Sequence, residues 1–131
     1  MKILIVDDEF VSQMRLHKVL ARFGECVVTD SGIEALTAFK DALKCSVPFH
    51  LATIDIVMPE LDGKEVLCKI REIERANNIT KEKRIKILMV TSDTNTDTVI
   101  TCAKAGCDDY IVKPFGREKI IKKIEKLGIQ N

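Results

Sequence analysis

Short apolar runs alternate with amphipathic stretches along the whole chain, and this alternation restricts the possible folds more than any other feature. Five runs rich in isoleucine and valine carry almost no charge, at residues 3–6, 26–28, 51–54, 85–90 and 110–112. Apolar runs of this length with so little charge predict strands that are buried on both faces. Between the runs, apolar residues recur every three or four positions, which predicts amphipathic helices. Five strand–helix units in succession indicate an α/β protein whose parallel sheet carries helices on both faces.

Residues that favour helix ends lie between these segments. Gly24 follows the first predicted helix, Ser31 and Asp62 precede the second and third, and Gly106 follows the fourth. Serine and aspartate are preferred caps at helix starts, and glycine is preferred after helix ends. The fourth helix, at residues 96–105, has only small or β-branched apolar side chains, so we expect it to pack loosely.

The length and charge of the chain limit the class of protein. Its 131 residues suit a single domain over 1–131 that is large enough to bury a core. The net charge of +1 provides no overall field that would attract nucleic acid or a membrane surface. Neither a membrane-spanning run nor a secretion signal is recognisable. Five cysteines without a CxxC pair indicate reduced thiols, and so a cytoplasmic protein.

Polar residues follow four of the five predicted strands. Asp7 and Asp8 follow the first strand, Asp55 the third, Thr91 the fourth and Lys113 the fifth. In an open parallel sheet the carboxyl ends of the strands share one edge, and ligands bind there. Each of these residues alone has an ordinary explanation, such as a helix cap or a solvated side chain. Their joint placement at one edge predicts a site.

The residue types at this edge suit phosphoryl chemistry with a metal. Three clustered carboxylates, those of Asp7, Asp8 and Asp55, would repel one another, and a divalent cation removes that conflict. Oxygen ligands alone favour Mg²⁺. The ammonium of Lys113 and the hydroxyl of Thr91 add the positive charge and the donor that a phosphoryl group needs. Asp55, on the central strand, is the best candidate nucleophile because a carboxylate can form an acyl phosphate.

Four segments carry a resemblance to a known family. They are IVDD at residues 5–8, DIVMPELDG at 55–63, MVTS at 89–92 and DYIVKPF at 109–115. With them, residues 2–127 resemble the receiver domain of two-component response regulators, and especially stand-alone receivers of the chemotaxis-regulator type. The resemblance implies a flavodoxin-like, doubly wound (βα)5 fold with the five strands in the order 2-1-3-4-5.

The resemblance also implies a role for each acidic residue. Asp55 would accept a phosphoryl group from a phosphohistidine of a sensor histidine kinase. Asp8, Asp55 and the backbone carbonyl of Val57 would bind Mg²⁺ directly, and Asp7 would bind it through water. The chain would not be an enzyme, because its only reactions would be Mg²⁺-dependent phosphorylation of itself and loss of the phosphoryl group at Asp55.

Three further positions follow from the resemblance. Lys113 would pair with the phosphoryl oxygens, and its bond to Pro114 would be cis. Thr91 would donate a hydrogen bond to a phosphoryl oxygen, and the ring of Tyr110 would follow it inward as a switch. The positions that tune phosphoryl lifetime in the family are Val57 and Asp93 in this sequence.

Output is expected through a protein partner. The binding surface would comprise the fourth helix, the fifth strand and the basic fifth helix, where Lys119 and Lys122 lie. The chain ends soon after that helix, so we expect no direct DNA binding, and a monomer or a weak phosphorylation-dependent dimer.

Two alternatives from other classes remain. A flavodoxin-like cofactor-binding module would need a first turn rich in serine, threonine and glycine, where this chain has Asp7, Asp8 and Glu9. A metal-dependent phosphohydrolase would need a second acid soon after Asp55, where this chain has Met58 and Pro59. A bound flavin would favour the first alternative, and steady turnover of small phosphomonoesters the second.

Overall fold

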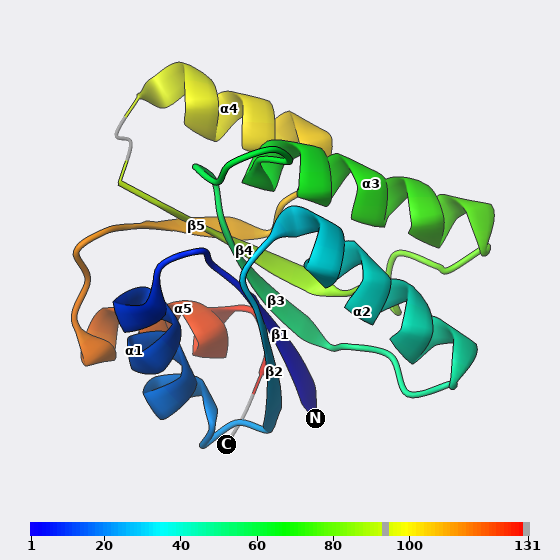
Figure 1. Cartoon of the computed structure of the whole chain (residues 1–131), viewed down its shortest axis with the longest axis horizontal. Helices are drawn as coiled ribbons and strands as arrows, with labels where there is room; N and C mark the ends of the chain where they lie inside the picture. Colours follow the sequence, from blue (N-terminus) through cyan, green and yellow to red (C-terminus); the bar gives the residue numbers. More distant parts are fainter. Residues whose placement is uncertain (93–94, 130–131) are drawn as a thin grey trace.

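The computed structural model describes residues 1–92 and 95–129 (Figure 1). Within them, five strands alternate with five helices: β1 (Lys2–Val6), α1 (Phe10–Leu20), β2 (Glu25–Thr29), α2 (Gly32–Lys44), β3 (Leu51–Asp55), α3 (Gly63–Ala76), β4 (Lys86–Thr91), α4 (Thr96–Ala105), β5 (Asp109–Val112) and α5 (Arg117–Lys126). The strands form one parallel sheet in the order β2-β1-β3-β4-β5. The predicted fold and strand order are confirmed. None of the helices in the described ranges is long and apolar enough to cross a membrane.

Helices cover both faces of the sheet. Figure 1 shows α1 and α5 on one face and α2, α3 and α4 on the other. The side chains of β1 alternate between two cores: Ile3 and Ile5 pack towards α1 and α5, whereas Leu4 and Val6 pack towards α2 and α3. This alternation is the two-residue period of a strand. It fixes which face of the sheet each polar residue beyond the strand will occupy.

The helix ends form as the sequence predicts at Ser31, Asp62 and Gly106, whereas α1 ends at Leu20 with Ala21 as its C-cap, before Gly24. The Ser31 hydroxyl accepts a hydrogen bond from the Glu34 amide at 3.1 Å at the start of α2. At the start of α3, Asp62 and Glu65 each accept the other's backbone N–H, at 3.0 and 3.3 Å, in a reciprocal capping box. Gly106 ends α4 with φ = 105°, a left-handed conformation that glycine adopts without strain. Of the ten residues of α4, all of them described, only Cys102 is buried, which agrees with the expected loose packing.

Burial of the strands on both faces holds for the middle of the sheet and is wrong for its edges. The five residues of β3 are all buried. In β2, however, Val28 is 37% exposed, and in β5 Tyr110 is also 37% exposed. Both strands lie at an edge of the sheet, where only one neighbouring strand covers them.

A buried arginine connects the C-terminal half of α3 to the start of β4 and the end of α4. Arg71 is 3% exposed, and its Nη1 donates to Glu74 Oε1 at 2.7 Å and to the Ile85 carbonyl at 2.9 Å. Its Nη2 donates to Asp108 Oδ2 at 3.1 Å, and its Nε donates to the Gly106 carbonyl at 3.0 Å. Arg71 therefore holds the start of β4 and the end of α4 against α3.

Candidate functional site

The carboxyl edge of the sheet gathers three carboxylates and one ammonium group. Asp7 and Asp8 follow β1, Asp55 ends β3, and Lys113 follows β5. Oxygen atoms of the three aspartates lie within 4.8 Å of one another. Lys113 Nζ lies 3.1 Å from Asp7 Oδ2 and 3.6 Å from Asp55 Oδ2. The structure thus brings together four of the side chains that the strand ends predicted.

Local hydrogen bonds fix the turn that follows β1. The Asp7 amide donates to the Thr29 carbonyl at 3.1 Å, and Asp7 Oδ1 accepts from the Glu9 amide at 2.9 Å. Gln13 Nε2 donates to the Asp7 carbonyl at 2.6 Å. Asp7 is fully buried, whereas the neighbouring Asp8 is exposed.

The chain turns sharply after Asp55. The Gly63 amide donates to the Ile56 carbonyl at 2.8 Å, so the start of α3 lies against the end of β3. A Cβ at Gly63 would overlap the backbone carbonyl of Asp55, and only glycine allows this approach. The Val57 amide donates a hydrogen bond to the Asp55 carboxylate, and the Val57 side chain is 66% exposed. The loop that carries Val57 therefore lies at the acidic cluster.

Burial and mutual repulsion disturb the acidity of Asp55. The pKa of Asp55 is raised from 3.8 to about 6, chiefly by desolvation; the charges of Asp7 and Asp8 also raise it, while the charge of Lys113 and the hydrogen bond from Val57 lower it. Burial also disfavours the charged form of Lys113. The hydrogen bond to Asp7 and the nearby charges of Asp55 and Asp7 outweigh this effect, so the pKa of Lys113 is raised. The three carboxylates together carry more negative charge than one lysine compensates, which is the condition that a divalent cation relieves.

Thr91 and Tyr110 lie on neighbouring strands at the same edge. Thr91 is buried at the end of β4, and its carbonyl accepts from the Lys113 amide at 2.6 Å. Tyr110 pairs in register with Met89, two residues before Thr91, so the two side chains leave the same face of the sheet. The Lys113–Pro114 bond is cis, as the resemblance implied. Asp93, the second position named for phosphoryl lifetime, lies outside the described residues.

One contact in the site was not anticipated from the sequence. Ser12, in the first turn of α1, accepts a hydrogen bond from Lys113 Nζ at 3.0 Å and donates one to Glu9 Oε1 at 2.9 Å. Glu9 and Ser12 are three residues apart, a spacing that places side chains side by side on a helix. That spacing is the one sequence signal for the contact between Ser12 and Glu9. The long-range contact with Lys113, across 101 positions, has no local signal.

Comparison with known proteins identifies this arrangement. The family model of the response regulator receiver domain matches residues 3–125. The chain belongs to this family. It is a receiver domain of two-component signalling similar to chemotaxis regulators, and neither the flavodoxin-like cofactor module nor the phosphohydrolase finds support.

Relatives of the receiver domain differ greatly in length. Chemotaxis protein CheY of Pseudomonas aeruginosa is 36% identical over 130 residues, which cover 97% of this chain and 95% of that protein. Hybrid signal transduction histidine kinase L of Dictyostelium discoideum is 34% identical over 129 residues, which cover 97% of this chain and only 7% of that protein. The same domain therefore occurs as nearly a whole protein in one relative and as a small part of another.

A solved structure matches the fold closely. It is the complex of the Saccharomyces cerevisiae histidine phosphotransfer signalling protein Ypd1 with the receiver domain of its downstream response regulator Ssk1. The likeness has a TM-score of 0.84 at 26% identity, covering 98% of this chain and 88% of the matched chain.

Proposed function

We propose that Asp55 is the phosphoacceptor of this receiver domain. The observation that carries the proposal is the cluster itself: three aspartate carboxylates within 4.8 Å of one another, with Lys113 Nζ 3.6 Å from Asp55 Oδ2. Among the three carboxylates, Asp55 ends the central strand, and its side chain is 10% exposed, so a donor can reach it. Its two neighbours Asp7 and Asp8 are then available to hold a cation.

The transfer exchanges one bond to phosphorus for another. A carboxylate oxygen of Asp55 forms a P–O bond as the P–N bond of a phosphohistidine breaks, and the departing imidazole takes up a proton from water. Lys113 pairs with a phosphoryl oxygen, and the Thr91 hydroxyl donates a hydrogen bond to another. Positioning and compensation of charge are most of what such a transfer requires from the protein.

A divalent cation, Mg²⁺, fits the residues at this edge. Asp8, Asp55 and the backbone carbonyl of Val57 would bind it directly, and Asp7 would bind it through water. Three hard carboxylate donors suit a hard cation that keeps part of its water shell. When bound, the cation supplies the positive charge that offsets the phosphoryl oxygens and the crowded carboxylates.

The phosphoryl donor in this proposal is a protein, a sensor histidine kinase or a histidine phosphotransfer protein. Support comes from the related receiver domain that is solved with such a protein. Large apolar side chains are also exposed near the acidic cluster, at the start of α1: Phe10 is 69% exposed, Val11 53% and Met14 57%. Exposed apolar patches beside a reactive group are typical of protein interaction sites.

Output in the proposal passes through α4, β5 and α5. Thr91 and Tyr110 form the switch, and the exposed basic residues Lys119 and Lys122 belong to the surface that binds a downstream protein. Charge reversal of both lysines is expected to weaken that binding and to leave phosphorylation of Asp55 intact. The chain would remain a monomer or form a weak phosphorylation-dependent dimer, without direct DNA binding; tight, salt-sensitive binding to duplex DNA would contradict this part.

We also propose that residues 1–131 constitute one receiver domain that works in the cytoplasm. The five cysteines are all free thiols, which suits a reducing compartment. Its only reactions would be gain and loss of the phosphoryl group at Asp55, so it would not turn over a substrate as an enzyme does.

The direct test is phosphorylation by a small donor. Wild type incubated with acetyl phosphate and Mg²⁺ should gain one phosphoryl group by intact mass, and should gain none when EDTA is present. Asp55→Asn should gain none. Asp30→Asn is the matched control, because Asp30 follows β2 at the same edge of the sheet and is exposed. Equal labelling of wild type and Asp55→Asn would overturn the assignment.

A further inference from the structure

Among the described residues, the Lys113 ammonium has two hydrogen-bond partners, one an aspartate and the other a serine. Its Nζ donates to Asp7 Oδ2 at 3.1 Å and to Ser12 Oγ at 3.0 Å, whereas Asp55 Oδ2 lies farther away at 3.6 Å. An ammonium group has three N–H bonds arranged around the nitrogen. With Asp7 and Ser12 occupying two of them, the third remains for Asp55 or for a phosphoryl group that Asp55 carries.

The Ser12 hydroxyl is itself held in place. It donates to Glu9 Oε1 at 2.9 Å, so its lone pairs remain to accept the N–H of Lys113. Glu9 is the N-cap residue of α1, but its side chain caps no backbone N–H of the helix. Its carboxylate is instead directed to Ser12, and its charge also stabilises the ammonium of Lys113.

Without Ser12, the lysine side chain would be anchored on one side only. A cavity of about 640 Å³ lies between α1 and α5, and Ser12, Glu9 and Lys113 line it. Lys113 is 22% exposed towards solvent, and four methylene groups separate its ammonium from the backbone. Such a long side chain has many rotamers, and hydrogen bonds at its end restrict them.

We propose that Ser12, oriented by Glu9, is a positioning residue that holds Lys113 with one N–H directed at Asp55. This inference rests on the proposed phosphorylation of Asp55 and adds a residue that touches neither the phosphoryl group nor the cation. Ser12 acts only through Lys113. Its loss is therefore expected to slow phosphoryl uptake and to leave Mg²⁺ binding unchanged.

The experiment measures the rate of phosphoryl uptake from saturating acetyl phosphate with Mg²⁺, by intact mass. Ser12→Ala should be slower than wild type by about 5- to 10-fold, the order expected when one hydrogen bond to a charged group is lost and water replaces it in part. Ser12→Thr keeps the hydroxyl and should return to within about 2-fold of wild type. Thr37→Ala, which removes a helix-surface hydroxyl from α2, is the matched control and should match wild type.

A second comparison separates positioning from a general effect on α1. If Ser12 acts through Lys113, Ser12→Ala should cause no further loss in a Lys113→Ala background, because effects within one interacting pair are not additive. A wild-type rate in Ser12→Ala, a slow Ser12→Thr, or an equal loss in both backgrounds would overturn the inference. Failure of the proposed function looks different: wild type would then take up no phosphoryl group, or Asp55→Asn would still be labelled.

Discussion

The ammonium of Lys123 lies 5.3 Å from the centre of the Tyr110 ring and 3.1 Å from Asp109 Oδ1. The carboxylate of Asp109 keeps the ammonium beside the ring, and an exposed cation–ring contact of this kind contributes on the order of 0.5–1 kcal/mol. The contact favours the outward position of Tyr110, with 37% of the residue exposed. In the switch that we propose, phosphorylation would have to outweigh only this small stabilisation.

Tyr110 provides an optical signal with which the proposed switch can be tested. It is the single tyrosine of the chain, and the chain contains no tryptophan. The intrinsic fluorescence excited at about 280 nm therefore comes from this ring. We expect acetyl phosphate with Mg²⁺ to lower the quenching of this fluorescence by acrylamide, because the ring moves inward towards the space that Thr91 leaves. Thr91→Ala should still be labelled at Asp55 but should lack that phosphorylation-dependent change. The same decrease in both proteins would refute the coupling.

Mg²⁺ should stabilise the unphosphorylated domain. A ligand that binds only the folded state raises the free energy of unfolding by about 1.4 kcal/mol at a free concentration roughly ten times Kd. We therefore expect the melting temperature of wild type to rise with millimolar Mg²⁺, and to rise much less in Asp8→Ala. Thermal unfolding monitored by circular dichroism, with and without EDTA, measures the rise in melting temperature for both proteins. Equal rises in the two proteins would exclude Asp8 as a ligand.

Without metal, the ionisation of Asp55 should destabilise the fold. Its pKa is about 6 in the folded protein against an ordinary value of 3.8, so between these pH values the folded state binds more protons than the unfolded state. The contribution of Asp55 to the free energy of unfolding is therefore present in full below pH ~4 and is lost as pH rises through about 6. By pH 7 the loss is on the order of 2–3 kcal/mol.

Asp55→Asn tests this pH dependence because the amide does not titrate. In EDTA, the free energy of unfolding of Asp55→Asn relative to wild type should grow by about 2 kcal/mol between pH 4 and pH 7. Urea denaturation at several pH values provides the measurement. A difference that stays constant over this range would show that Asp55 titrates normally.

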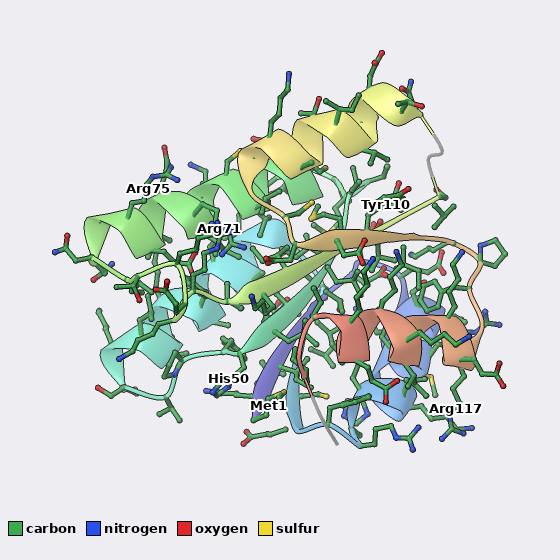
Figure 2. The ribbon with its side chains drawn as sticks, turned by 180° about the vertical axis from the view of Figure 1, so that it is seen from behind. Met1, His50, Arg71, Arg75, Tyr110 and Arg117 are labelled. Carbon is green, nitrogen blue, oxygen red and sulfur yellow. The ribbon has the colours of Figure 1, made fainter. Side chains whose placement is uncertain are left out.

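The buried arginine of α3 should matter far more for stability than its exposed neighbour. Figure 2 shows Arg71 on the sheet side of α3 and Arg75 on the outer side. Arg71→Ala leaves the buried carboxylate of Glu74 and the partly buried one of Asp108 without this partner, which is expected to cost about 3–5 kcal/mol. Arg75→Ala, on the same helix, should cost about 0.5 kcal/mol or less. Urea denaturation of the two variants at pH 7 compares them, and similar losses would contradict the role of Arg71.

The sequence was sufficient for the parts of the fold that local patterns encode. The apolar runs within the strands, the amphipathic helices and the caps at Ser31, Asp62 and Gly106 each depend on residues close together in the chain, and the structure contains them. The aspartates and Lys113 were also brought together correctly, because parallel strands necessarily end at one edge. The strand order came from family resemblance, since periodicity alone does not define which strands are neighbours.

Contacts between segments that are distant in the sequence could not be predicted, because no local pattern encodes them. Arg71 lies beside an apolar stripe, where a charged residue is usually solvated, and its partner Asp108 is 37 positions away. Exposure of Val28 depends on β2 being an edge strand, which no residue within β2 encodes. In the sequence, Ser12 has the pattern of an ordinary serine on a helix surface, and only the fold shows that it contacts Lys113.

The hydrogen bond from Arg71 to the Gly106 carbonyl anchors the C-terminal end of α4 to the neighbouring helix α3. The C-terminal end is tied to α3 by a buried guanidinium, while along its length the helix buries only Cys102. In the switch that we propose, a movement of α4 would therefore be small near Gly106 and larger towards Thr96. A partner that distinguishes the two states of the proposed switch would detect this difference best at the Thr96 end of the helix, which follows the carboxyl edge of the sheet.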